Sequence, residues 1–198
     1  MKAVTIKDIA RVLDISVSTV GRALADSPQI SEETKARVRQ AAIEAGYVAH
    51  SGARAMRSGR STLIGLLVPD IQNDFYGTVA QALAACCAAA GYQLVLGVTD
   101  ENPDTELNQI RGLMEARVAG VVIVGSASPH PETLVLLSRI HTVQLIRRIA
   151  GLDSAWFGMD DAGCLEVSTA SLIGLGHRRI AYVGGARELS TGDRRLGG

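Results

Sequence analysis

The apolar residues of the first 46 positions recur at helical spacing in three short segments. A hydroxyl residue stands just before each segment (Thr5, Ser16 and Ser31), where its oxygen can accept a hydrogen bond from a free backbone N–H. Gly46 follows the third segment as a stop signal. The pattern predicts a bundle of three short helices, at residues 6–13, 16–24 and 32–45.

From residue 63 onward, apolar strands alternate with helical segments. Runs such as "LIGLLV" and "GVVIVG" are continuously apolar, which is typical of strands that are covered on both faces. The alternation predicts a parallel α/β sheet. We expect strands at 63–68, 92–98, 120–125, 142–146 and 179–185, and helices at about 75–90, 105–117, 132–140 and 162–175.

Residues 47–60, "YVAHSGARAMRSGR", fit neither pattern. They hold two glycines, three arginines spaced three residues apart and one large apolar side chain, Met56. If this segment formed a helix, the helix would be too short to be stable by itself in water. We therefore expect a helical domain at 1–46, a hinge at 47–60 and an α/β domain at 61–198.

Charge is distributed unevenly along a chain that is neutral as a whole. Residues 1–60 hold ten Lys and Arg against six Asp and Glu, a balance of +4, and residues 61–198 hold ten against fourteen, a balance of −4. Such asymmetry indicates a part that faces nucleic acid, joined to a neutral or acidic part, although solvated helix faces alone also produce differences of this size.

The chain carries no pattern of a secreted or membrane protein. Its three cysteines do not make a disulfide framework, and small buried thiols are the simpler interpretation of Cys86 and Cys87. The start, "MKAVTIKDIA", lacks the apolar core of a signal peptide, and no apolar run approaches the ~20 residues that span a bilayer. We expect a protein of the reducing cytoplasm.

The first two expected helices, joined by a short turn, have the layout of a helix-turn-helix motif. In this motif the start of the second helix contacts base edges in the DNA major groove. The outward positions here are Val17, Ser18, Gly21 and Arg22. Arg22 can pair with guanine and Val17 can touch a thymine methyl, while small donors at helix starts suit phosphates. A three-helix bundle without DNA is the alternative.

The run "TIKDIARVLDISVSTVGRALADSPQISEETKARVRQAAIEAGY" resembles the DNA-binding headpiece of the lactose-repressor (LacI/GalR) family of bacterial transcription regulators. The match has no gap from Val4 to Tyr47, and Gly21 replaces the usual serine, at a cost to the helix of ~1 kcal/mol against alanine. The resemblance implies a homodimer at the bacterial nucleoid that binds a pseudo-palindromic double-stranded operator. The DNA contacts that we expect in the headpiece are Thr5, Ser16, Val17, Ser18, Thr19, Arg22, Ser31, Thr34 and Tyr47.

The resemblance also gives the connector a role. In the family it becomes a short helix on the operator, and two such helices press an apolar wedge into the minor groove. In this sequence the wedge falls on Met56, with arginines beside it to meet the narrowed groove. Three departures from the family pattern (Ala49, His50 and Gly52) predict a less stable hinge than usual, and a plain flexible linker is the alternative. The expected hinge contacts are His50, Ala53, Arg54, Met56 and Arg57.

"IGLLVPDIQNDFYGTVAQAL" and "LIGLGHRRIAYVGG" resemble the family's sensor domain, which is related to periplasmic sugar-binding proteins. The resemblance implies a first lobe at about 61–150, the start of a second lobe at 151–198, and a small effector such as a sugar or sugar acid. The sequence has "LIR" at 145–147 where many members have "LID". Loops at the carboxyl ends of parallel strands bind ligands in such folds. The expected effector contacts are Asp70, Asn73, Phe75, Tyr76, Thr191 and Arg195.

Motifs of catalysis are missing from the sequence. It has no P-loop and no GxSxG elbow, and neither His141 nor His177 has a Cys, Asp or Glu at metal-binding spacing. We expect no enzyme, no cofactor and no metal. A solute-binding protein of transport would lack the helical headpiece. Because the chain covers about three-fifths of a typical family member, an architectural or constitutive DNA-binding protein with a truncated, non-functional sensor is the alternative function.

Overall fold

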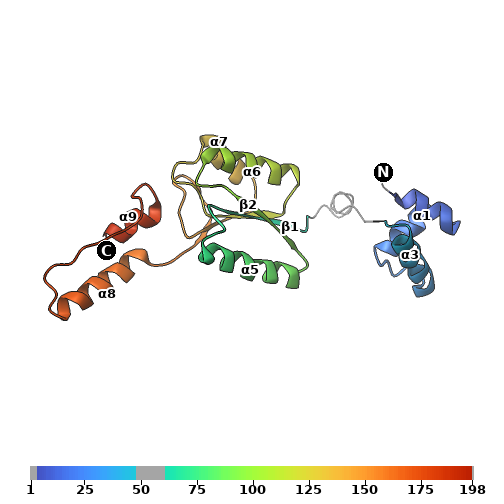
Figure 1. Ribbon diagram of the computed structural model, residues 1–198. Coiled ribbons are helices and arrows are strands. Elements are labelled where there is room, and N and C mark those ends of the chain that lie inside the picture. The colour runs from blue at the N-terminus through green and yellow to red at the C-terminus, as the bar shows by residue number, and fades with distance from the viewer. Residues whose placement is uncertain (1–3, 48–60, 198) are drawn as a thin grey trace. The chain divides into compact units, whose positions relative to one another are not determined.

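The chain divides into two compact units, Met1–Arg57 and Ser58–Gly198. The computed structural model describes residues 4–47 and 61–197 (Figure 1). Apart from Tyr47, the expected hinge therefore lies outside the described residues. That holds for its five predicted DNA contacts, which are His50, Ala53, Arg54, Met56 and Arg57.

The first unit contains the three short helices that the apolar pattern predicts. Each helix starts directly after the residue that was expected to cap it. The Ser16 hydroxyl accepts a hydrogen bond from the Thr19 backbone N–H at 3.0 Å, and Ser31 accepts one from Thr34 at 3.3 Å. Such caps satisfy backbone groups that a helix end leaves without partners. The helices are α1 (Ile6–Leu13), α2 (Val17–Leu24) and α3 (Glu32–Glu44).

The core of the first unit is small and aliphatic. Each helix contributes to it: Ile9 from α1, Val20 and Ala23 from α2 and Val38 from α3 are at most 1% exposed. Gly21 was expected on the outward side of α2, and that prediction is wrong, because the residue is buried. Without a side chain, only its backbone could meet solvent, and that backbone is covered.

The second unit is built around a parallel sheet of five strands in the order β2-β1-β3-β4-β5. The strand order reverses direction beside β1, so that the connections after β1 and β2 leave on opposite faces. This is the topology of an open α/β sheet with a crevice at the carboxyl ends of its strands. The strands are β1 (Leu63–Val68), β2 (Gln93–Val98), β3 (Gly120–Ile123), β4 (Thr142–Leu145) and β5 (Ala155–Phe157).

Helices cover both faces of this sheet. Figure 1 shows α5 (Asp74–Ala89) on one face and α6 (Pro103–Glu115) with α7 (Pro131–Leu137) on the other. The larger core lies under α6 and α7 and includes Leu67 and Ile123 from the sheet, whereas the core under α5 is smaller. The expected parallel α/β sheet is thus confirmed. Two further helices are α8 (Asp161–Gly174) and α9 (Ser190–Gly197).

Residues 179–185, "RIAYVGG", are not a strand, and the sequence-based prediction was wrong at this point. A strand needs a hydrogen-bonded neighbour, and no strand lies beside this segment in the part of the chain that the structure describes. Val183 is 95% exposed as a result. The sequence analysis also missed β5, which has only three residues and no alternating pattern of its own.

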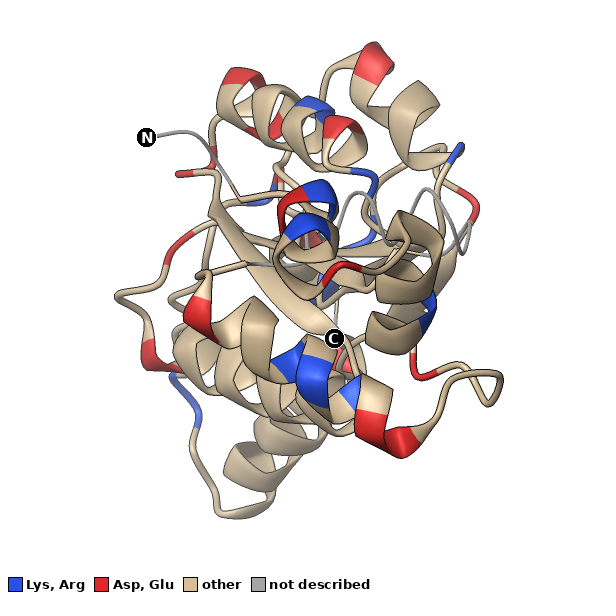
Figure 2. Cartoon of the chain, turned by 90° about the vertical axis from the view of Figure 1, so that its right-hand side faces the viewer, with Lys and Arg blue, Asp and Glu red and all other residues tan. Residues whose placement is uncertain are grey.

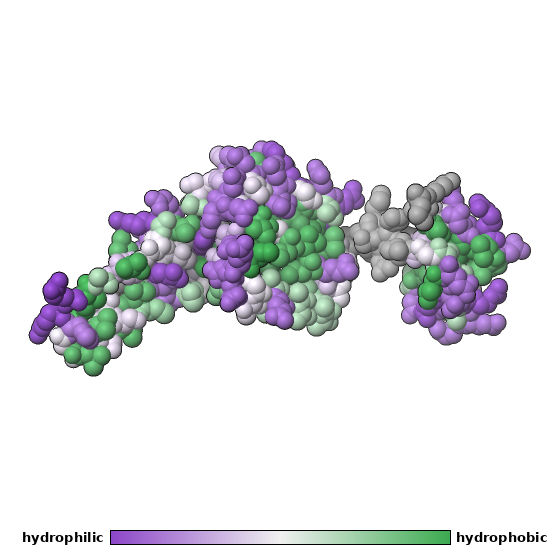
Figure 3. Space-filling view, in the orientation of Figure 1, coloured by the Kyte–Doolittle hydropathy of each residue, from purple (hydrophilic) through white to green (hydrophobic). Residues whose placement is uncertain are grey.

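Apolar surface remains exposed on the second unit (Figure 3). The edge strand β2 exposes Val95 and Leu96, and α8 exposes Val167 and Ile173. Where such residues are neighbours, as Val95 and Leu96 are, exposed apolar surface marks a site of interaction more often than isolated exposed residues do. Among the described residues, no helix combines the length and the apolar character that a bilayer crossing requires.

Candidate DNA-binding and effector sites

The start of α2 presents a set of small polar and apolar side chains to solvent. Val17 is 46% exposed, and Ser18 beside it is also exposed. The Ser16 hydroxyl lies 2.7 Å from that of Ser18 and 2.8 Å from that of Thr19, so the cap also orders its neighbours. This geometry leaves the first turn of α2 free to enter a groove.

Arg22 lies on the exposed surface of α2, and its guanidinium has no hydrogen-bond or ion-pair partner among the described residues. A guanidinium without an internal partner is available for a bidentate contact with guanine. The remaining predicted contacts of the first unit are exposed or half-buried: Thr5, Ser31, Thr34 and Tyr47. The Tyr47 ring packs against the helical core.

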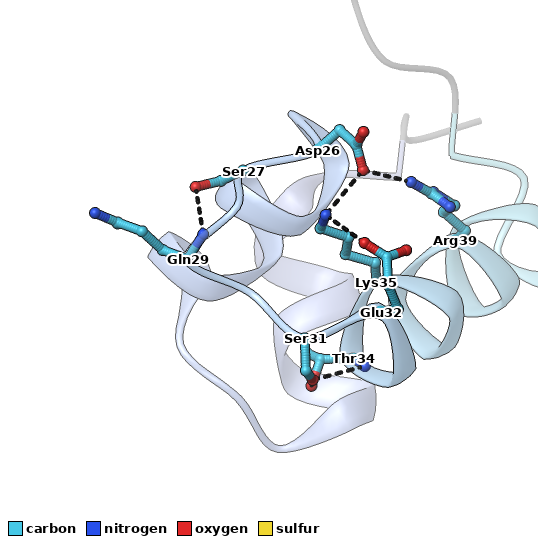
Figure 4. A network of polar contacts seen from close by, with 8 residues as sticks. All are labelled: Asp26, Ser27, Gln29, Ser31, Glu32, Thr34, Lys35 and Arg39. Atoms are coloured by element: carbon cyan, nitrogen blue, oxygen red, sulfur yellow. Dashed lines mark hydrogen bonds and ion pairs between the residues drawn. The ribbon is translucent and has the colours of Figure 1, made fainter.

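Two cations of α3 are held by internal ion pairs (Figure 4). The Lys35 ammonium lies 2.7 Å from the Glu32 carboxylate and 3.1 Å from that of Asp26. The Arg39 guanidinium lies 2.8 Å from the same Asp26 oxygen. The hydrogen bond from Lys35 is the main reason why the pKa of Asp26 is lowered, with Arg39 adding to it. These two cations therefore tie α3 to the loop that follows α2.

The described part of the first unit carries no net charge. Residues 4–47 hold six Lys and Arg against six Asp and Glu; Figure 2 marks the two kinds of charged residue in blue and red over the whole chain. The surplus of +4 in the first 60 residues comes from Lys2, Arg54, Arg57 and Arg60. Long-range attraction to a polyanion must therefore come mainly from these four side chains.

In the second unit, a cavity of about 250 Å³ brings together five of the six predicted effector contacts. Phe75 and Tyr76 lie at the start of α5 with their rings edge to face, 5.5 Å between centroids. Arg195 of α9 donates through Nε to the buried Asp161 carboxylate at 2.7 Å. The five residues that line the cavity are Asn73, Phe75, Tyr76, Thr191 and Arg195.

Asp70, the sixth predicted contact, does not line this cavity. Its carboxylate accepts a hydrogen bond from the Gln72 backbone N–H at 2.7 Å, which orders the loop after β1. Asn73, two residues before Phe75, caps α5 by accepting from the Phe75 backbone N–H at 3.0 Å. The cap positions both aromatic rings at the cavity, whereas the geometry of Asp70 is that of a turn residue.

Arg147 also lines the cavity, and the sequence analysis did not name it as a site residue. Its guanidinium pairs with both oxygens of the Glu101 carboxylate, at 2.7 Å and 2.6 Å, and donates to the Gly125 carbonyl at 3.2 Å. Burial disfavours the charge on Arg147, but the Glu101 carboxylate raises the pKa of Arg147 above its ordinary value. The available signal was a cation directly after a buried strand, at the ligand-binding edge of the sheet.

Glu106 of α6 is a fully buried carboxylate next to this edge. Its oxygens accept from the Ser126 backbone N–H at 2.7 Å and from the Ser126 hydroxyl at 3.0 Å, which fixes the loop after β3. Burial raises the pKa of Glu106 above the ordinary 4.5, against the opposing effect of the two hydrogen bonds. The folded state therefore binds the Glu106 proton more tightly than the unfolded state does.

We expect Glu106→Gln to remove a pH dependence of stability in the second unit. Because the pKa is higher in the folded state, Glu106 contributes full stability below pH 4.5, and this contribution is lost as the pH rises through the raised pKa. Glutamine can still accept from the Ser126 N–H through its oxygen and can donate to the Ser126 hydroxyl through its amide nitrogen, and it carries no charge. Thermal melts from pH 4 to pH 7 should show the variant gaining on the parent as the pH rises. A constant difference between the two melting temperatures across this range would contradict the prediction. Glu106→Ala leaves the Ser126 N–H without its partner, so it should lower the free energy of unfolding by about 1–3 kcal/mol.

Arg147 also lines a second cavity, of about 540 Å³. Two guanidinium groups lie close to the ring of Trp156, the chain's one tryptophan: Arg148 lies 4.3 Å and Arg194 5.3 Å from the centre of the ring. The Trp156 indole N–H also donates to the Ile146 carbonyl at 3.2 Å. Its fluorescence is therefore a natural reporter on the residues around Arg147.

Comparison with known families accounts for both units. A family model described as "Bacterial regulatory proteins, lacI family" matches residues 5–50. A second, described as "Periplasmic binding proteins and sugar binding domain of LacI family", matches residues 61–198. The chain belongs to the LacI family. The resemblance that the sequence suggested is thereby confirmed for the helical unit and for the α/β unit.

LacI-family relatives match the chain along most of its length. The transcriptional regulator GalR of Salmonella typhimurium is 32% identical over 195 residues, which cover 98% of this chain and 57% of GalR. Catabolite control protein A of Priestia megaterium is 28% identical over 93% of this chain and 56% of its own length. The chain therefore spans a little under three-fifths of the length of these relatives.

Solved LacI-family structures share the fold. A lac repressor dimer bound to operator and the anti-inducer ONPF superposes with a TM-score of 0.82 over 98% of this chain and 60% of its own, at 19% identity. The Cra regulator of Pseudomonas putida, in complex with fructose 1-phosphate, gives 0.65 over 70% of this chain and 52% of its own, at 25% identity. These likenesses confirm the expected fold, with partial coverage of the second lobe.

Proposed function

We propose that this LacI-family chain is a sequence-specific DNA-binding transcription regulator that acts as a repressor. The observation that carries the proposal is the exposed start of α2, where Val17 and Ser18 face solvent and the Arg22 guanidinium has no partner among the described residues. A helix that served only to pack a bundle would not need to leave this surface and this guanidinium free. The proposed role is that of a regulator and not of an enzyme.

The proposed working form is a homodimer on a two-fold symmetric operator. Each copy supplies one headpiece, and two α2 helices then read two half-sites about one helical turn of DNA apart. The exposed apolar residues of the second unit, such as Leu96, offer surface that a second copy can cover. Phosphate contacts fall to the hydroxyls at the helix starts and base contacts to Val17, Ser18 and Arg22.

The hinge is proposed to supply the attraction that the neutral helical bundle lacks. Arg54, Arg57 and Arg60 hold most of the surplus positive charge of the first 60 residues. A basic segment of this kind suits a minor groove that has been narrowed by bending, and Met56 among the arginines is the candidate wedge between base pairs.

Met56→Ala should reduce operator binding and operator bending together. Loss of the wedge removes the side chain that would stabilise the unstacked base step, so affinity should fall by roughly tenfold, the equivalent of ~1.4 kcal/mol. Circular-permutation gel shifts measure the bend and titrations measure the affinity. The matched control is Met114→Ala in the second unit, which should change neither. A Met56 variant that bends and binds like the parent would reject the wedge.

The sensor is proposed to take a small sugar or sugar acid in the cavity between the start of α5 and α9. Phe75 and Tyr76 offer apolar faces, and Thr191 and Arg195 offer polar contacts on the opposite side. An effector that favours one arrangement of the dimer would change the separation of the two hinges and so the affinity for the operator.

Footprinting on the DNA upstream of the gene tests this function. The expected result is a protected site with two-fold symmetry, and protection that changes when galactose, gluconate or fructose 1-phosphate is added. Protection that none of a wide set of sugars alters would favour a constitutive DNA-binding protein, for which the unpaired segment 179–185 is the supporting observation. Absence of any protected site would contradict both functions.

A further inference from the structure

Arg147 connects the carboxyl ends of four neighbouring strands. It follows β4, pairs with Glu101 in the loop after β2, and donates to the carbonyl of Gly125 after β3. Its charge also acts on the Tyr76 hydroxyl, at the start of the helix after β1, where it opposes the upward pKa shift that burial causes. The guanidinium thus lies across the strand ends, where open α/β sheets bind their ligands.

The two partners of this ion pair differ in how firmly they are held. The Arg147 side chain is 10% exposed, whereas that of Glu101 is 45% exposed. Glu101 and the preceding Asp100 both have positive φ, 57° and 52°, a conformation that residues other than glycine adopt at a cost. Arg147 is fixed by its surroundings, and Glu101 is the partner that can leave.

A buried guanidinium needs an anion, but not necessarily this one. Removing the carboxylate from a buried pair is strongly unfavourable unless another anion replaces it. Arg147 lines both cavities, so its partner can be exchanged from within the space where a ligand would lie. Two charged residues line the smaller cavity, Arg147 and Arg195, and both carry positive charge. The Arg195 terminal nitrogens have no hydrogen-bond partner among the described residues, since only Nε is paired.

We propose that Glu101 occupies Arg147 as an internal substitute for an anionic group of the effector, and that the effector carries a carboxylate or phosphate which takes its place. This inference rests on the proposed sensor function and narrows the effector to an anionic sugar derivative. A neutral sugar would leave the Glu101 pair intact. An anionic one releases the Glu101 loop, which links ligand binding to a change at the edge of the sheet. Arg147 is the residue that determines this specificity.

Glu101→Gln provides the test, with inorganic phosphate and acetate as probes at constant ionic strength. The variant leaves Arg147 buried without its anion, so the second unit should melt at a lower temperature than the parent and recover as phosphate or acetate is added. In Glu101→Gln, the anion concentration that restores half of the lost melting temperature should be about tenfold lower than the concentration that first raises the melting temperature of the parent. The reason is that the variant has no Glu101 carboxylate to compete with the anion for the Arg147 guanidinium. Trp156 fluorescence follows binding directly, because the indole bonds to Ile146, which immediately precedes Arg147.

Two variants make this test specific. Glu188→Gln removes the same charge from an exposed residue of the larger cavity that does not pair with Arg147, and it should respond like the parent. Glu101→Gln combined with Arg147→Met removes both charges of the pair and should not respond to either anion. The more effective of the two anions identifies the effector group as a carboxylate or a phosphate.

Equal stabilisation of the parent, Glu101→Gln and Glu188→Gln would overturn the proposal, as would a response that persists in the double variant. These measurements use no DNA, so they are independent of the regulatory function. If the anion responses are as expected but the chain protects no DNA site, the anion site at Arg147 stands and the proposed regulatory function is rejected.

Discussion

Ile9→Ala is expected to unfold the helical headpiece and abolish DNA binding, while the second unit stays folded. Ile9 is 1% exposed and lies in the core that all three headpiece helices share. Truncating such a side chain to alanine costs about 2–5 kcal/mol. A domain of this size buries little surface and has only a few kcal/mol of stability in total, so a loss of this magnitude leaves it largely unfolded.

Thermal melts followed by circular dichroism measure this effect. The parent should show two transitions, one for each compact unit, and the variant should lose the headpiece transition alone. Val12→Ala is the matched control, since Val12 lies on the same helix and is 76% exposed; it should change stability by less than about 0.5 kcal/mol. Operator affinity that survives Ile9→Ala would show that the bundle does not present the DNA-reading helix.

Arg22→Ala is expected to weaken operator binding without destabilising the headpiece. Arg22 is exposed and its guanidinium lacks a partner among the described residues, so the fold does not depend on its charge. A bidentate contact with guanine contributes about 1–3 kcal/mol of discrimination, and a dimer loses two of them. The affinity for the preferred site should fall by one to four orders of magnitude, and the preference for guanine at one position of each half-site should disappear.

The control for Arg22 is Arg11→Ala, which removes the same charge from the surface of α1. Arg11 lies 3.4 Å from Asp8 and is not among the predicted base contacts. Its replacement should leave base preference unchanged and have at most a small effect on affinity at all sites. Competition titrations with single-base operator variants separate the two results. If both variants lowered affinity equally for every sequence, Arg22 would be a general electrostatic contact and not a reader of bases.

Local signals in the sequence were sufficient for most of the fold. The helices of the headpiece were predictable because Thr5, Ser16 and Ser31 combine capping chemistry with apolar spacing, and each structural helix begins one residue after its cap. The strands of the second unit were predictable because continuous apolar runs of strand length indicate strands buried on both faces. Both signals act over a few residues and do not depend on distant partners.

The features that the sequence did not show depend on distant partners. The strand expected at 179–185 has the right composition but no neighbour to pair with in the described residues. The ion pair of Arg147 joins residues 46 positions apart in the chain, and no local pattern relates them. Phe75, Tyr76, Thr191 and Arg195 were associated only through the family resemblance, and it is the fold that brings them to one cavity.

Asp70 and Gly21 show a different limit of sequence reasoning. A polar residue after a buried strand can bind a ligand or order its own loop, and the hydrogen bond from the Gln72 N–H to Asp70 shows that it orders the loop. Helical periodicity assigned Gly21 to the outward side of α2, but a residue without a side chain is exposed only if its backbone is. For Gly21 the tertiary contacts of α2 decided between two possible environments, whereas the Asp70 hydrogen bond is local and leaves its contact with an effector as a prediction.

Selection of binding sites from a random pool of duplexes by the purified chain tests most directly whether α2 reads DNA sequence. If the account is right, the enriched duplexes share two half-sites related by two-fold symmetry, with a guanine in each half that the Arg22→Ala protein no longer selects. Duplexes that are retained without any common sequence, and are released only by salt, would contradict it.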